Sequence, residues 1–138
     1  MNQAIISVGS NIEPERNCYQ AYEILNQEHT ILSKSSFRVT APVGYQNQPD
    51  FLNGAFCIET SLERLDFNHY LKQVERRLGR IKGPIKSGPR TIDLDIIIWN
   101  RYVVHDDFYS RDYVYPFVQD LIHKHQIVLQ DNGLLATL

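Results

Sequence analysis

Two aspartates, Asp93 and Asp95, stand two positions apart in the segment 91–99, which is otherwise apolar after Thr91. Alternate residues of a strand point to the same face, so both carboxylates are expected on one face. The opposite face would carry Ile92, Leu94, Ile96 and Ile98. Carboxylates roughly 7 Å apart repel each other unless a cation lies between them. The pattern therefore indicates either a solvent-facing strand that carries two acids or a site for a hard divalent cation.

The most basic part of the chain lies directly before this pair. Residues 72–90 carry seven basic side chains and one acid, a net charge of +6, whereas the whole chain carries -2. The basic residues are Lys72, Arg76, Arg77, Arg80, Lys82, Lys86 and Arg90, and the acid is Glu75. Alone, this run would fit a solvated helix face followed by a loop. Beside two carboxylates it favours a magnesium-nucleotide site, because carboxylates bind Mg²⁺ and arginines bind the phosphates that the metal leaves uncovered.

Length and composition bound the class of protein. A chain of 138 residues with 43% hydrophobic and 22% charged side chains favours one globular domain over residues 1–138. The two cysteines are too few for a disulfide framework, and no Walker A pattern for a P-loop enzyme is present. No apolar run approaches the roughly 20 residues of a membrane span, and no signal-peptide pattern is seen. We expect a cytoplasmic protein without a membrane or nucleic-acid partner. The sequence leaves the oligomeric state open, with a monomer favoured.

Periodicity and turn signals predict the elements that must hold these residues. Strands are predicted over 3–8, 31–41, 51–60 and 91–99, and helices over 14–27 and 63–79. Loops are predicted over 42–50 and 80–91, a short edge strand at 103–104 and a last helix over 117–125. The order β-α-β-β-α-β is typical of an α+β ferredoxin-like fold, in which both helices pack on one face of an antiparallel sheet.

Four motifs share their order and spacing with one enzyme family. They are Gly9-Ser10-Asn11, the segment QPDFLN at 48–53, Glu75 with the Leu78-Gly79-Arg80 that follows, and GPRTIDLD at 88–95. The last motif is highly specific, and together they resemble hydroxymethyl-dihydropterin pyrophosphokinase over about residues 3–99. The resemblance implies an enzyme of folate biosynthesis that transfers pyrophosphate from ATP to the hydroxymethyl group of 6-hydroxymethyl-7,8-dihydropterin and releases AMP.

The resemblance also implies roles around the phosphates. Asp93 and Asp95 would bind two Mg²⁺ ions that bridge the ATP phosphates, and Arg80 and Arg90 would contact the phosphates in transfer. The residues implied near the nucleotide are Glu75, Lys82, Arg90, His105 and Arg111. For His105, a surface or packing role is the alternative.

A second set of roles concerns the pterin. Asn53 would hydrogen-bond the ring, and Thr40 and Val43 would offer backbone groups to its other edge. Phe51 and Tyr113 would supply the aromatic walls, where many relatives carry tyrosine and phenylalanine respectively. Plain core packing is the alternative for both rings, and a simple strand-to-helix turn is the alternative for residues 9–11.

Two other hypotheses stay open, one from departures from the family pattern and one from the basic run. Relatives often carry an arginine and a tryptophan where this chain has the loop 81–87, and a longer hairpin and terminal region after Trp99. A non-catalytic relative that binds a pterin or nucleotide, as a sensor or partner subunit, would fit these changes. Nucleic-acid binding on the sheet would fit the basic run, but the RNP1 pattern is absent and the two aspartates would repel a phosphate backbone.

Overall fold

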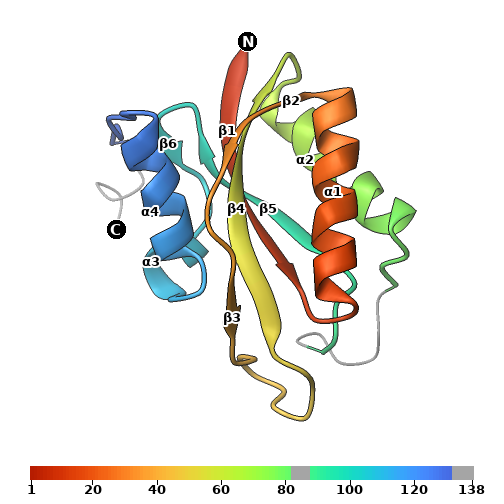
Figure 1. Ribbon diagram of the computed structural model, residues 1–138. Helices are drawn as coiled ribbons and strands as arrows, with labels where there is room; N and C mark the ends of the chain where they lie inside the picture. Colours follow the sequence, from red (N-terminus) through yellow and green to blue (C-terminus); the bar gives the residue numbers. More distant parts are fainter. Residues whose placement is uncertain (82–87, 132–138) are drawn as a thin grey trace.

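In a computed structural model of the chain, residues 1–81 and 88–131 are described. The elements are β1 (Asn2–Ser10), α1 (Pro14–Glu28), β2 (Thr30–Lys34), β3 (Arg38–Thr40), β4 (Phe51–Thr60), α2 (Arg64–Arg77), β5 (Asp93–Trp99), β6 (Tyr102–Val103), α3 (Asp107–Ser110) and α4 (Tyr115–Lys124). The strands form one antiparallel sheet in the order β2-β4-β1-β5-β6, and β3 also pairs with β4. Helices α1 and α2 lie on one side of the sheet and α3 and α4 on the other (Figure 1).

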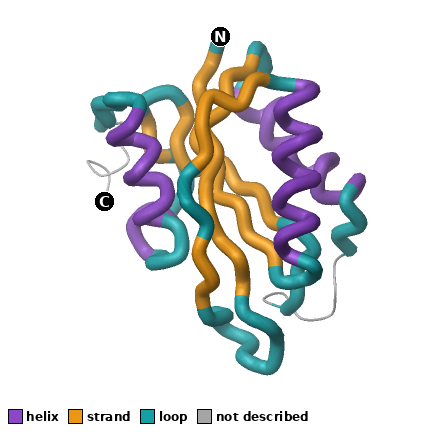
Figure 2. The backbone as a smooth tube through the Cα atoms, in the orientation of Figure 1, coloured by secondary structure: helices purple, strands orange, loops and turns teal. Residues whose placement is uncertain are grey.

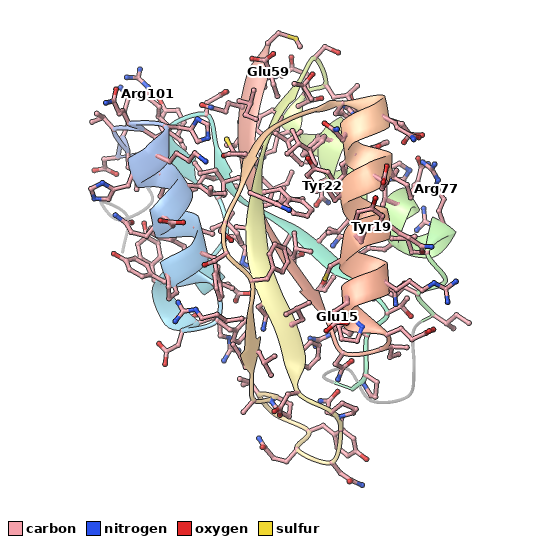
Figure 3. All side chains as sticks on the ribbon, viewed as in Figure 1. Glu15, Tyr19, Tyr22, Glu59, Arg77 and Arg101 are labelled. Atoms are coloured by element: carbon pink, nitrogen blue, oxygen red, sulfur yellow. The ribbon has the colours of Figure 1, made fainter. Side chains whose placement is uncertain are left out.

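The predicted α+β fold with α1 and α2 on one face is confirmed. Each helix places apolar residues three or four positions apart against the sheet, the spacing of one helical face. They are Cys18, Ala21 and Leu25 of α1 and Phe67, Leu71 and Val74 of α2. Tyr22, labelled in Figure 3, extends from α1 toward the sheet and meets the ring of Phe56 edge-on at 5.7 Å. This cluster fixes both helices against β1, β4 and β5.

The strand predicted over 31–41 is two strands, β2 and β3. The ring of Phe37 lies against Gly54 so closely that a Cβ atom there would overlap it. The chain therefore leaves regular pairing at 35–37 to fit this ring. Ser35 keeps the two halves together, because its N–H donates to Ala55 O at 2.9 Å and its hydroxyl accepts the Ala55 N–H at 2.9 Å.

One predicted orientation in β5 is wrong. The register between β1 and β5 shifts at Ile97, which makes an extra residue in β5, a β-bulge. The bulge turns Ile98 to the α4 side and Trp99 to the α1 and α2 side, instead of the alternation expected from the sequence. Asp93 and Asp95 precede the bulge, so the expected alternation holds in their part of the strand.

The second face of the sheet is only partly covered. The predicted last helix is α4, which begins two residues earlier than expected with Pro116 in its first turn, and the short α3 was not predicted. Helix α4 packs against Ile5, Ala55 and Cys57 in the middle of the sheet. Toward the other end of this face, β1 presents Ser7 and Gly9, which leaves a polar, uncovered area. Across the described residues, every helix falls short of the length and hydrophobicity that crossing a bilayer requires.

Both cysteines are buried, free thiols. Burial raises the pKa of Cys18 to about 12 and that of Cys57 to about 11. Because the thiolate is the reactive form, we expect neither to react with a disulfide reagent at about pH 8 in the folded protein, and both to react after unfolding. Thiol absorbance assays with and without guanidinium measure this. A thiol that reacts within minutes in the native protein would contradict it and reveal local opening.

Candidate active site

A cleft occupies the uncovered end of the second sheet face, next to the segment that leads into α4. Nine residues for which the sequence predicted a role in binding or catalysis line it: Thr40, Val43, Phe51, Asn53, Arg90, Asp93, Asp95, Arg111 and Tyr113. They come from positions far apart in the chain, and they meet because β4, β1 and β5 are neighbours in the sheet. The long connection between β3 and β4, which contributes Val43, extends beyond the sheet in Figure 2.

One end of the cleft is built around the amide of Asn53, which is 6% exposed. Its Nδ2 donates a hydrogen bond to Thr40 Oγ1. Gly9 is the partner of Asn53 across the β1–β4 pair, and a Cβ atom on Gly9 would lie 2.6 Å from Asn53 Oδ1. Gly9 therefore makes room for the amide. The sequence marked Gly9 as part of the Gly9-Ser10-Asn11 motif, with a simple turn as the alternative, and gave it no role beside Asn53. Glycine inside a strand is a signal of such close approach.

Two aromatic rings line the same cleft. Phe51 is 8% exposed, and the guanidinium carbon of Arg90 lies 5.5 Å from its ring centroid. Tyr113 is half-buried and packs against the apolar cluster of α3 and α4. Burial raises the pKa of Tyr113, so its hydroxyl stays protonated at neutral pH. Phe51 is thus buried and Tyr113 is packed on the core, and both still form part of the cleft wall.

Cations of the protein lie beside both carboxylates, as the repulsion argument required. Arg80 Nη1 is 2.9 Å from Asp93 Oδ1, and Arg90 Nη1 is 4.0 Å from Asp93 Oδ2. On the other side, Lys72 Nζ is 3.1 Å from Asp95 Oδ1. Burial, followed by repulsion from Asp93, raises the pKa of Asp95, so a cation brought to this carboxylate stabilises its charged form.

Glu75 lies behind the aspartates, outside the lining of the cleft. Glu75 as a whole residue is 5% exposed. Its carboxylate accepts hydrogen bonds from Lys72, Arg80 and the Leu94 N–H at 3.0, 3.0 and 2.7 Å. In the described part of the chain, β6 pairs only with the end of β5, so the outer edge of β5 near Leu94 has no strand partner. Glu75 supplies that partner from α2. Its burial raises its pKa, in opposition to the two cations.

Behind Asp95 a second cleft opens between α2 and the segment that follows β6. It is lined by Arg64, Leu65, Asn68, Asp95, Ile96, Val104 and His105. Asp95 also lines the first cleft, so the two clefts meet at this carboxylate. Among the predicted nucleotide residues, His105 lies here, Arg90 and Arg111 line the first cleft, and Lys82 lies outside the described residues.

Asp107 joins two of these residues and was not found from the sequence. Its backbone N–H donates to His105 Nδ1 at 3.1 Å, and its carboxylate lies 3.8 Å from Arg111 Nε. Asp107 is the first residue of α3, and it lines the first cleft. No sequence signal marked it, because α3 is a single short turn of helix.

The donor chemistry of the site fits Mg²⁺ bound together with phosphate. Within residues 1–81 and 88–131, no group of three or more His, Cys, Asp or Glu side chains is placed to hold a metal by itself. Two carboxylates on one strand would supply only part of the shell of a hard cation. Mg²⁺ characteristically takes one or two carboxylates and completes its shell with substrate phosphates and water.

Comparison with known proteins identifies relatives of the chain. A family model described as 7,8-dihydro-6-hydroxymethylpterin-pyrophosphokinase matches residues 5–123. The 2-amino-4-hydroxy-6-hydroxymethyldihydropteridine pyrophosphokinase of Bacillus subtilis is 40% identical over 124 residues, 82% of this chain and 74% of that protein. The Haemophilus influenzae protein of the same name is 31% identical over 125 residues, 83% of this chain and 78% of that protein. The matched span contains every residue of both clefts, and the chain belongs to the 7,8-dihydro-6-hydroxymethylpterin-pyrophosphokinase family.

Proposed function

We propose that this chain transfers the pyrophosphoryl group of ATP to the hydroxymethyl group of 6-hydroxymethyl-7,8-dihydropterin, with one cleft for each substrate. The observation that carries this is that Asp95 lines both clefts, so a donor and an acceptor would meet at the carboxylate pair. The pterin hydroxyl oxygen would attack the β-phosphorus and release its proton to water. The bond from that phosphorus to the α–β bridging oxygen would break, and AMP would leave with this oxygen. The cytoplasm is the proposed compartment, because the reaction uses ATP and because both cysteines are free thiols.

The first cleft is proposed as the pterin site. Asn53 would read the ring by hydrogen bonds, Thr40 and Val43 would face its other edge with backbone groups, and Phe51 and Tyr113 would stack on it. A buried amide such as that of Asn53 discriminates strongly between ligands. A ligand that leaves the amide without a hydrogen-bond partner binds more weakly by the full free-energy cost of desolvating it.

The second cleft and the carboxylate pair are proposed as the nucleotide site. Asp93 and Asp95 would hold two Mg²⁺ ions, which when bound neutralise phosphate charge and polarise the transferred group. Arg80 and Arg90 would bind the phosphates, and His105 would lie beside the nucleotide. Arg111 and Lys82 would place positive charge beside the phosphates of the nucleotide. Glu75 would act on the nucleotide only through Lys72 and Arg80, the two cations that it binds. Transfer of this kind depends mostly on positioning and charge neutralisation.

Turnover tests the proposal directly. The protein is incubated with ATP, Mg²⁺ and hydroxymethyl-dihydropterin, and AMP is quantified against an Asp95→Ala control. We expect AMP and the pterin diphosphate in equal amounts. AMP at the background of the control would reject catalysis, and calorimetric pterin binding without turnover would favour a non-catalytic binding protein instead.

Gly9→Ala tests the pterin side. The added Cβ would displace the Asn53 amide, so we expect pterin affinity to fall about tenfold, the loss of one hydrogen bond to a buried group. Affinity for a non-hydrolysable ATP analogue should stay within about twofold. Calorimetry measures both, and Ser7→Ala, on the same strand and in the same cleft, is the matched control. Unchanged pterin affinity in Gly9→Ala would show that Asn53 does not contact the ring.

A further inference from the structure

Lys72 belongs to the basic run at 72–90, and its ammonium group has three hydrogen-bond acceptors. Its Nζ donates to Leu94 O at 2.7 Å, to Glu75 Oε2 at 3.0 Å and to Asp95 Oδ1 at 3.1 Å. An ammonium group has three N–H donors, so these acceptors use all of them. Burial lowers the pKa of Lys72, but attraction to Asp95 and Glu75 outweighs it and the pKa is raised, which keeps the group charged.

The three acceptors differ in kind. Leu94 O belongs to the β5 backbone, and Glu75 is a buried residue of α2, so two contacts attach Lys72 to the framework. The third, Asp95, lines both clefts. Lys72 thus connects the framework to one oxygen of the carboxylate at the junction of the clefts.

The position of Lys72 in the chain makes this connection rigid. Its neighbours Leu71 and Val74 are fully buried in the core, so α2 is held at this turn. Arg80 makes comparable contacts with Asp93, but it lies beyond Gly79, whose φ of 93° ends the helical path. Of these two contacts between a cation and an aspartate, the one to Asp95 is therefore made from within α2, and the one to Asp93 from beyond its end.

We propose that Lys72 is a positioning residue for pyrophosphoryl transfer, which orients the Asp95 carboxylate by holding Oδ1 and so directs Oδ2 to the metal. This inference rests on the proposed function of the two clefts. Lys72 would touch neither substrate. Without it, repulsion from Asp93 and Glu75 would turn the Asp95 carboxylate away, and outer partners of metal ligands typically contribute 10-fold to 100-fold in metal affinity or activity.

The direction in which Mg²⁺ affinity changes distinguishes a positioning role of Lys72 from a purely electrostatic one. Removal of a positive charge beside two carboxylates, by itself, would make the site more attractive to Mg²⁺. Loss of the orientation of Asp95 would make Mg²⁺ bind more weakly. The two roles therefore predict opposite changes in the same measurement.

The test compares Lys72→Met with Arg76→Met in the full chain. Arg76 is an exposed cation on the same helix, so its replacement removes an equal charge without touching Asp95. The readout is the Mg²⁺ concentration that gives half-maximal binding of a non-hydrolysable ATP analogue, measured by calorimetry. We expect this concentration to rise about tenfold in Lys72→Met and to stay within about twofold in Arg76→Met. In turnover, kcat should fall about tenfold or more while the KM for the pterin is unchanged.

A second comparison assigns the effect to Asp95. In an Asp95→Asn background, Lys72→Met should add no further loss of Mg²⁺-dependent analogue binding, because coupled residues are not additive. Tighter or unchanged Mg²⁺ dependence in Lys72→Met, an equal loss in Arg76→Met, or a fully additive loss would overturn the proposal. If Lys72→Met fails to fold, Lys72→Gln, which can still donate to Leu94 O, takes its place with the same expected shift. Wild-type AMP formation, run in parallel, shows separately whether the proposed function itself holds.

Discussion

Asp95→Asn is expected to lower kcat for pyrophosphoryl transfer by at least about a thousandfold, a loss of roughly 4 kcal/mol of transition-state stabilisation. The amide has the shape of the carboxylate but no charge, and Asp95 is the residue at which both clefts meet. Charge neutralisation at the phosphates would therefore fail where donor and acceptor come together. Pterin affinity should remain within about twofold, because the proposed ring contacts lie on β3, β4, the connection between them and the segment before α4. AMP release and calorimetric pterin binding measure the two quantities.

Asp120→Asn is the matched control for this substitution. Asp120 is an exposed aspartate of α4 outside both clefts, so the same change of charge there should leave kcat within about twofold. An Asp95→Asn protein that keeps more than about a tenth of wild-type turnover would contradict the assigned role. Loss of pterin binding together with turnover would indicate damage to the fold instead.

Glu75→Ala is expected to lower the free energy of unfolding by about 3 kcal/mol. The substitution leaves the Leu94 N–H without its partner and removes the carboxylate that Lys72 and Arg80 share. The side chains of Lys72 and Arg80 are 33% and 26% exposed. Water can therefore solvate both cations after the substitution, which reduces the loss of stability. Glu75→Gln, which keeps an acceptor oxygen but not the charge, should lose less, about 1–2 kcal/mol. Urea denaturation followed by circular dichroism measures both.

Glu15→Ala provides the comparison for Glu75→Ala. Glu15 is an exposed residue in the first turn of α1, labelled in Figure 3, and its favourable interaction with the helix N-terminus amounts to about 0.3–1 kcal/mol. Equal losses in the two variants would show that the cluster around Glu75 contributes little to stability. If Glu75 contacts the nucleotide directly, Glu75→Gln would instead raise the KM for ATP with stability retained.

Local sequence signals predicted most of the framework. The apolar spacing of Cys18, Ala21 and Leu25 identified α1 and its buried face, and the alternation around Leu94 placed the two aspartates on one side of β5. These signals work because helix and strand periodicity depend only on neighbours along the chain. The signals failed at Phe37 and Ile97, where contacts with another strand override local preference.

The sequence alone determined the family resemblance, the carboxylate pair, the adjoining cations and the elements that carry them, since each is a pattern within a short segment. Only the tertiary structure decided that Gly9 makes room for Asn53, that Lys72 binds Asp95 and that Asp95 lies between two clefts. These relations join residues tens of positions apart. They depend on strand order, on the register of β1 with β4 and on the packing of α2 along the edge of β5 near Leu94. Those quantities result from packing of the whole chain, because no local segment specifies which distant side chain will satisfy its polar groups.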